Sequence, residues 1–406
     1  METYIPREIE KVIVQSSKQF PAVAVTGPRQ SGKTTLLRHL FRDSHQFVSF
    51  DDPLTRERAL TDPKLFLDSY GESVILDEIQ YVPELLSYIK IAIDKDRHKT
   101  GRFLLTGSQQ FHLINELGDS LAGRIALLNL LPFNVTEKQR TEIVNDSFKD
   151  TKTYFIHACL QGSFPELVLH PRENTDLWYG SYLQTYLERD VRNLANVGDL
   201  RNFQRFVRLL ASRCAQILNL TSFANDLGVS VNTIKRWISI LEASQMIFLL
   251  SPYYRNLGKR IVKSPKVYFL DVGLVCYLTR IRTEEHLLNG PMGGQLFENF
   301  VIQEIVKCYY NHGKQTNLFY LRTQNQLEID LIIEKQYEEI YPIEIKLAKT
   351  LSTGMSKPIE RFIKLFPSLN VRTGMLISLA DEVFPLSANT MALSFDSFLE
   401  KLKEFI

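Results

Sequence analysis

The chain has 406 residues, and its 48 basic and 46 acidic side chains leave a formal net charge of only +2. This length excludes a single ordinary core, so two or three domains are expected. The near-neutral balance gives no global indication of a nucleic-acid or membrane partner, and any basic surface must be local.

The polar N-terminus, the short apolar runs and the spacing of the cysteines favour a cytoplasmic protein without a membrane partner. The N-terminal stretch METYIPREIEK is too polar for a secretory signal, and no apolar run approaches the roughly 20 residues of a membrane helix. The cysteines form no CxxC pair and lack metal-ligand spacing, so buried free thiols in a reducing compartment are expected. They are Cys159, Cys214, Cys276 and Cys308.

Short apolar runs alternate with helical patterns in the first third of the chain. The runs lie at 22–26, 47–50, 73–77 and 102–107, and a helical pattern occupies 83–95. Strands that alternate with helices predict an α/β domain, in which helices cover both faces of a parallel sheet. We place this domain at residues 1–150.

Residues 27–34 read GPRQSGKT, which is the phosphate-loop pattern G-x-x-x-x-G-K-[ST] between a predicted strand and a predicted helix. Glycines let backbone amides curl around phosphate oxygens, and the helix N-terminus adds positive potential there. Lys33 is expected to reach the β- and γ-phosphates, and Thr34 to bind Mg²⁺. The predicted nucleotide-binding residues are Gly27, Pro28, Arg29, Gln30, Ser31, Gly32, Lys33, Thr34 and Thr35.

Polar residues near the ends of the following runs complete the predicted ATPase site. Asp77 is expected to hold the Mg²⁺ shell, and Glu78 to orient or deprotonate the attacking water. Ser108, with Gln109 in reserve, is a candidate sensor of the γ-phosphate, the alternative being a polar turn. Arg124 is a candidate arginine finger or sensor, in the same chain or in another copy of a homo-oligomer, the alternative being a structural surface arginine.

These motifs carry a family resemblance. GPRQSGKTTLL, DDP (51–53), LDEIQ, LLTGSQ and LAGR are similar to a large family of prokaryotic AAA-type ATPases that carry a C-terminal domain of unknown function. The resemblance continues through 252–274, 293–301 and 327–346, and so covers nearly the whole chain. It implies ATP binding and hydrolysis, with ATP and Mg²⁺ as cofactors.

The middle of the chain is expected to be helical at 151–200 and a winged helix-turn-helix at 201–287. Within 220–250, Gly228 makes the turn and Ser230 caps the second helix. The outward face of that helix suits a DNA major groove, and a basic wing suits phosphate contacts, the alternative being packing against other domains. The outward residues are Asn232, Thr233, Lys235, Arg236 and Ser239, and the wing residues are Arg255, Lys259, Arg260, Lys263 and Lys266.

The last predicted domain, 288–406, places acids and a lysine on a helix and two strands. Glu298 begins a helix, Asp330 lies in one strand, and Glu344 and Lys346 share a face of the next. This combination resembles the restriction-endonuclease-like superfamily, which implies that Asp330 and Glu344 hold a divalent metal while Lys346 helps to activate water. The alternatives are solvated charges on a strand or an inactive nuclease fold.

Two functions therefore remain open on the sequence. The first is an ATP-driven enzyme that binds double-stranded DNA and cuts nucleic acid with its last domain. The second is an ATP-dependent regulatory switch or scaffold whose nuclease-like domain is inactive.

Overall fold

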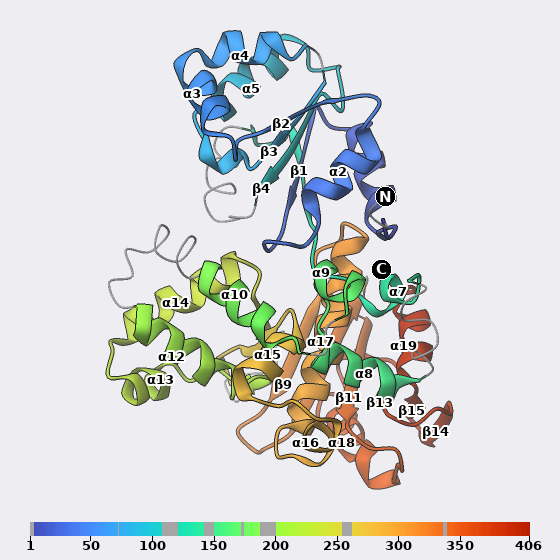
Figure 1. Ribbon diagram of the computed structural model, residues 1–406. Helices are drawn as coiled ribbons and strands as arrows, with labels where there is room; N and C mark the ends of the chain where they lie inside the picture. Colours follow the sequence, from blue (N-terminus) through green and yellow to red (C-terminus); the bar gives the residue numbers. More distant parts are fainter. Residues whose placement is uncertain are drawn as a thin grey trace.

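The computed structural model describes residues 4–71, 73–107, 121–141, 150–171, 174–186, 200–253, 262–335 and 339–406. The chain folds into an N-terminal unit, at the top of Figure 1, and a larger remainder below it. Among the described residues, no helix is both long enough and apolar enough to span a membrane. All four cysteines are buried and free, as predicted.

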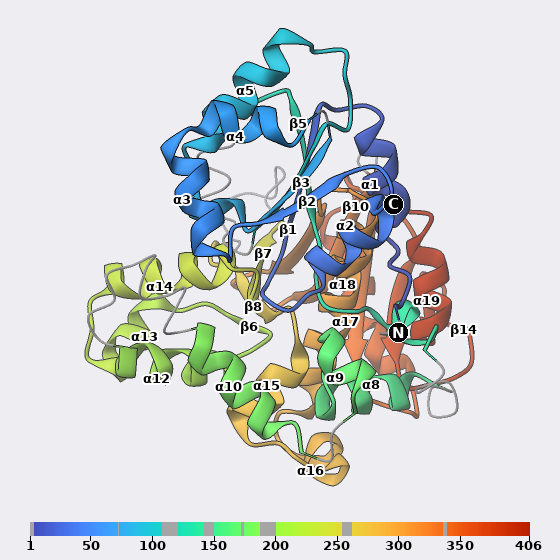
Figure 2. The same cartoon turned by 45° about the horizontal axis from the view of Figure 1, so that its top comes forward.

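The N-terminal unit is built on a parallel five-stranded sheet of order β2-β3-β4-β1-β5, which confirms the predicted α/β core. Alternate residues of β1 face opposite sides: Ala22 and Ala24 pack with α3, α4 and α5, whereas Val23 and Val25 pack with α1 and α2 (Figure 2). The strands are β1 (Ala22–Thr26), β2 (Gln46–Ser49), β3 (Val74–Asp77), β4 (Phe103–Gly107) and β5 (Ile125–Asn129). The helices are α1 (Glu10–Ser17), α2 (Lys33–Phe41), α3 (Pro53–Thr61), α4 (Pro63–Ser69) and α5 (Leu85–Lys95).

The largest hydrophobic core of the remainder runs from Leu131 to Leu402, and smaller clusters lie beside it, such as the one that contains Leu321, Ile332 and Phe362. Its first helices are α7 (Val135–Lys138), α8 (Thr151–Leu160), α9 (Pro165–Leu169) and α10 (Asp176–Tyr186). They are followed by α12 (Leu200–Ala211), β6 (Gln216–Ile217), α13 (Leu220–Leu227), α14 (Val231–Ala243), β7 (Ile247–Pro252), β8 (Lys266–Phe269), α15 (Val272–Thr279) and α16 (Glu284–Asn289). The last elements are α17 (Gly293–Asn311), β9 (Leu318–Arg322), β10 (Glu328–Lys335), β11 (Glu339–Lys346), α18 (Lys357–Leu365), β12 (Asn370–Val371), β13 (Gly374–Ser378), β14 (Phe384–Ser387), β15 (Thr390–Leu393) and α19 (Phe395–Leu402).

One mixed sheet crosses the boundary that the sequence suggested near residue 287. Its order is β14-β15-β13-β11-β10-β9-β7-β8-β6, and β12 pairs with β11. The joint is the parallel pairing of β7 with β9, where Ser251 faces Phe319 and Pro252 faces Tyr320. Helix α17 is buried along most of its length and packs on β8 and β11, so the regions 201–287 and 288–406 form one body rather than two.

Candidate functional site

The phosphate loop joins the end of β1 to the start of α2, and its glycines fit where a side chain does not. A Cβ on Gly27 would lie 2.1 Å from the carbonyl oxygen of Leu130, and Gly32 has a left-handed φ of 93°. The buried ammonium of Lys33 donates to the carbonyl oxygens of Gly27 at 3.0 Å and Pro28 at 2.9 Å. The lysine is therefore held inside the curve of the loop.

Asp77 lies where three neighbouring strands and α2 meet. The Thr34 hydroxyl donates to its Oδ1 at 2.6 Å, the Thr106 hydroxyl donates to the same oxygen at 2.6 Å, and Ser49 Oγ donates to Oδ2 at 3.2 Å. Ser49, Asp77 and Thr106 come from β2, β3 and β4, whose carboxyl ends share one edge of the parallel sheet. The carboxylate is thus buried, oriented, and in direct contact with the first turn of α2.

Glu78 follows Asp77 in a left-handed backbone conformation, with φ of 57°, which is uncommon for a residue with a side chain. Its amide donates to the Thr106 hydroxyl at 3.1 Å, and Gln80 hydrogen-bonds to its carboxylate. This turn places Glu78 in the wall of a cavity of about 390 Å³ above the loop, whose lining also includes Arg29, Gln30, Gly32, Lys33, Thr34 and Thr35.

The opposite wall of this cavity comes from α10, which no motif indicated. Tyr182 and Thr185 line it from a helix about 150 positions after the loop in sequence. The Tyr182 ring is held by Trp178, stacked at 5.2 Å, and by Phe164 at 4.9 Å. The only sequence signal was the row of aromatic residues at helical spacing in 178–186, which indicates a packed helix and not a ligand.

Arg124 is not brought to the phosphate loop. Its carbonyl oxygen accepts a hydrogen bond from the amide of Ala22, at the start of β1, whereas the loop follows the other end of that strand, about 13 Å away at strand rise. Its guanidinium binds both carboxylate oxygens of Asp94, at 2.8 and 3.1 Å. A role for Arg124 at the loop of its own chain is therefore wrong. The predicted sensor Ser108 and its reserve Gln109 lie outside the described residues.

Arg7 supports the loop from behind, and the sequence gave no indication of it. Its guanidinium donates to the carbonyl oxygens of Ser31 at 3.0 Å and Leu131 at 2.7 Å. It also forms a buried ion pair with Glu137 of α7 at 3.0 Å and lies over the Phe133 ring. Arg7 thus connects the phosphate loop to the first residues of the larger unit.

A second polar contact connects the base of the loop to the end of α14. Asn129 Oδ1 accepts from the hydroxyl of Thr26, the residue before the loop, at 2.9 Å, and from Nε2 of Gln245 at 2.7 Å. Next to Gln245, Ser244 shares a hydrogen bond of 2.7 Å with Tyr186 at the end of α10. The elements around the cavity are therefore tied to the end of α14.

Glu298, Asp330, Glu344 and Lys346 do come together in the C-terminal half. The Lys346 ammonium lies 3.1 Å from Asp330 and 2.8 Å from Glu344, on adjacent antiparallel strands. Glu298 joins through the buried Lys266, at 3.0 Å, and Lys266 is 3.9 Å from Asp330. Asp330, Glu344 and Lys346 border a cavity of about 520 Å³, which Lys357 and Arg361 also line.

The predicted metal ligands Asp330 and Glu344 are each paired with Lys346 through one oxygen, while Oε1 of Glu344 is buried without a hydrogen-bond partner. Within the described ranges no set of three His, Cys, Asp or Glu side chains is arranged to hold a metal ion. Burial, with a further contribution from the Asp330 charge and against the lowering effect of the lysines, raises the pKa of Glu344 to about 8 and that of Glu298 to about 7. The cluster is a buried lysine–carboxylate network.

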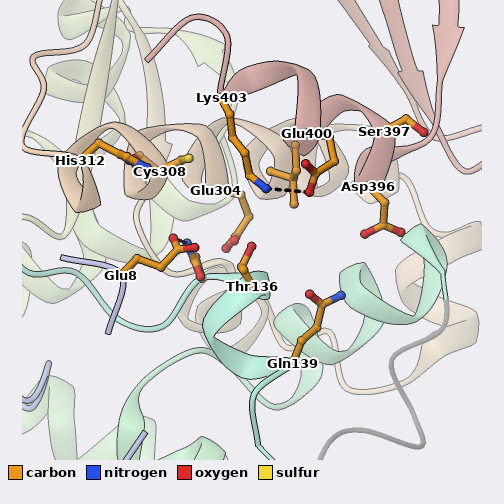
Figure 3. A pocket seen from close by; sticks show the side chains of 12 residues that line it. Glu8, Thr136, Gln139, Glu304, Cys308, His312, Asp396, Ser397, Glu400 and Lys403 are labelled. Atoms are coloured by element: carbon orange, nitrogen blue, oxygen red, sulfur yellow. Dashed lines mark hydrogen bonds and ion pairs between the residues drawn. The ribbon is translucent and has the colours of Figure 1, made fainter. Parts of the chain in front are cut away.

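A further cavity, of about 300 Å³, contains none of the predicted residues. Figure 3 shows the carboxylates of Glu8, Glu304, Asp396 and Glu400 around it, with Lys403 paired to Glu400 at 2.7 Å. Glu304 is already engaged, because it accepts from the amide of Val135 and pairs with Lys307. This cavity lies at the seam between the chain start, α7, α17 and α19.

Three family models match successive parts of the chain. Residues 19–138 match an AAA domain, 152–285 match a domain of unknown function (DUF8612), and 293–398 match another (DUF4143). The first match agrees with the loop and the parallel sheet, so the N-terminal unit is similar to AAA-type P-loop domains. The other two family models describe domains of unknown function, so they indicate no particular activity.

The relatives and solved structures found are distant. An uncharacterized protein of Mycobacterium tuberculosis is 29% identical over 382 residues, which are 93% of this chain and 81% of the relative. One of Methanocaldococcus jannaschii is 24% identical over 405 residues, covering 88% of this chain and 81% of the relative. A Walker-type ATPase of Pyrococcus abyssi is 16% identical with a TM-score of 0.44, covering 68% of this chain and 95% of that chain.

Proposed function

We propose that this protein binds Mg²⁺·ATP with its phosphates over residues 27–35 and hydrolyses it. The observation that carries the proposal is the 2.6 Å hydrogen bond between the Thr34 hydroxyl and Asp77, beside a loop that already encloses Lys33. A hydroxyl and a carboxylate are hard oxygen donors of the kind that Mg²⁺ takes at phosphate sites. Thr34 and Asp77 would hold the ion, which neutralises charge on the phosphate oxygens.

The remaining chemistry falls to side chains of the cavity. Lys33 exchanges its two carbonyl partners for phosphate oxygens, a favourable exchange because an ionised acceptor makes the stronger hydrogen bond. Glu78 receives the proton of the attacking water, or orients that water, after its contact with Gln80 opens. Tyr182 and Thr185 close the cavity from α10 and help to exclude bulk water.

Nucleotide binding and ATP turnover of Lys33→Ala test the proposal. Both should be lost, because the loop then lacks the ammonium that its carbonyl groups hold inside its curve. Lys64→Ala is the matched control, since Lys64 is exposed on α4 of the same unit and should leave both unchanged. Wild-type binding and turnover in Lys33→Ala would remove the basis of the proposal.

Duplex-DNA binding by α13 and α14 is the second candidate function. Helix α13 ends at Gly228 in the left-handed region, Ser230 caps α14, and Asn232, Lys235 and Arg236 are exposed on the outward face. With α12 and the strands β6, β7 and β8, this order of elements supports a winged-helix arrangement. Of the predicted wing residues, Lys263 is exposed, whereas Arg255, Lys259 and Arg260 lie outside the described residues.

The prediction that Lys266 belongs to an exposed basic wing is wrong. It is 2% exposed and paired to carboxylates, so it is not available for phosphate contacts.

Fluorescence anisotropy with a duplex near 50 mM salt, a low-salt condition that favours phosphate contacts, tests the DNA proposal. Lys235→Glu with Arg236→Glu should weaken binding, while Lys64→Glu should not, and absence of wild-type binding assigns α14 to packing alone.

A further inference from the structure

A buried lysine from β8 lies among the acids of the C-terminal network. Its ammonium is 2.8 Å from Glu328 Oε1, 3.0 Å from Glu298 Oε1 and 3.9 Å from Asp330 Oδ1, and its side chain is 3% exposed. The three acids come from α17 and β10, whereas Lys266 comes from the strand next to β7. One cation therefore meets acids from two elements of the predicted nuclease-like region.

The surroundings of Lys266 keep its charge. Burial alone lowers the pKa of the ammonium, but the carboxylates of Glu298, Asp330 and Glu328 raise it above the ordinary lysine value. The Tyr268 hydroxyl donates to the same Glu298 oxygen at 2.6 Å, which fixes this carboxylate toward Lys266. The cation is thus permanent at neutral pH and cannot leave without uncovering buried negative charge.

The two lysines of the network divide the acids between them. Lys346 takes Glu344 and the Oδ2 oxygen of Asp330, and the amide of Ile345 also donates to Oδ2 at 3.0 Å. Lys266 faces Oδ1 of Asp330, the oxygen on which a divalent ion shared with Glu298 would have to act. An ion placed between these two oxygens would lie at contact distance from the Lys266 ammonium, and the repulsion between the two positive charges would weaken its binding.

We propose that Lys266 is a built-in counter-cation that stands in place of a divalent metal in this acid network. The network then holds β8 and its helices against α17 and β10 and does not act as a metal centre. This inference is independent of the nucleotide site, because neither Lys266 nor its partners line the cavity above the phosphate loop.

Titration of the nucleotide-free protein with Mn²⁺, followed by calorimetry and by electron paramagnetic resonance of the free ion, tests the inference. At about 1 mM, a concentration at which weak oxygen sites fill, the wild type should take up no more Mn²⁺ than Asp330→Asn, a comparison that subtracts any ion held by Thr34 and Asp77. Lys266→Met keeps the length of the side chain and removes its charge, so it should bind one ion per chain at least ~10-fold more tightly than wild type. Lys266→Arg, which keeps the charge, should bind no more than wild type.

Lys357→Met is the matched control, because Lys357 lines the neighbouring cavity and is exposed. Its Mn²⁺ titration should equal that of wild type. Stoichiometric Mn²⁺ uptake by the wild type that Asp330→Asn abolishes overturns the inference, and so does a folded Lys266→Met variant without any gain. If Lys266→Met fails to fold, the wild type and Asp330→Asn titrations alone still decide.

Discussion

Glu78 combines an unusual backbone with a place in the cavity wall. Its left-handed φ turns the chain directly after Asp77, so adjacent acids serve different surroundings: Asp77 is buried among hydroxyls, and Glu78 borders open space. A conformation of this kind costs free energy and is found where function requires it.

We expect Glu78→Gln to retain ATP binding and to lower turnover by at least ~10²-fold, because an amide cannot accept the proton of water. Parallel measurements of nucleotide affinity and steady-state turnover separate the two effects. Glu84→Gln, an exposed acid at the start of α5, should behave as wild type. Wild-type turnover in Glu78→Gln would assign Glu78 to structure alone.

His157 gives the larger unit a pH dependence. Burial, with a smaller effect of the Lys138 charge, lowers the pKa of His157 to about 3. The folded state therefore resists protonation, whereas the unfolded chain takes up a proton below about pH 6.5. Stability is fully present above that value and is lost as the pH falls toward 3, by roughly 2 kcal/mol at pH 5.

The corresponding measurement is urea unfolding at pH 7 and pH 5 for wild type and His157→Gln. The variant should lose about 2 kcal/mol less than wild type between the two values, because it has no imidazole to protonate. An equal loss in both proteins would show that other groups dominate acid sensitivity. His98→Gln, on the N-terminal unit in an exposed position, is the matched control.

At the level of elements, the contact of Asn129 with Gln245 joins the strand beside the phosphate loop to the end of α14. Asn129 Oδ1 and Gln245 Nε2 lie 2.7 Å apart, and the Thr26 hydroxyl donates to the same Asn129 oxygen. A double-mutant cycle of Asn129→Ala and Gln245→Ala should give a coupling of about 0.5–1.5 kcal/mol in unfolding free energy, the usual net value of one hydrogen bond. Additive single effects would contradict the contact.

The elements that sequence reasoning predicted best are those whose signal is contiguous. The phosphate loop and the acid pair at the end of β3 are short patterns, and each lies beside the strand that the sequence predicted for it. Tyr182, Thr185 and Arg7 were missed, because their roles depend on a tertiary approach that no local pattern encodes. Lys266 was misassigned since it follows a run of basic residues, whereas the strand that it begins is buried on both faces.

At the scale of the whole molecule, two units with separate cores should unfold separately. The parallel sheet has its own apolar clusters, one on each face, and in the remaining chain one large cluster extends through β7 and β9. Calorimetry should therefore show two transitions, with the regions 201–287 and 288–406 melting together.

Mg²⁺·ATP should raise the unfolding free energy of the N-terminal unit, by roughly 2.7 kcal/mol at 100-fold excess over its dissociation constant, because all the proposed ligands of the phosphates and of Mg²⁺ lie in that unit. Lys33→Ala should lose this shift and keep the second transition. A third transition would contradict the shared core, a single transition would show that the units unfold as one, and a shift of both transitions would show that α10 also contacts the nucleotide.

The continuous sheet also sets how movement travels through the larger unit. Nine strands that follow one another across the sheet, spaced about 4.8 Å apart, span roughly 40 Å from β6 to β14. A rigid tilt of about 5° at the β6 end, where α13 and α14 attach, would displace the β14 edge by about 3 Å at that spacing. Such a tilt would therefore move the β14 edge further than the β6 end at which it arises. The contact of Gln245 with Asn129 lies toward the β6 end, next to the phosphate loop.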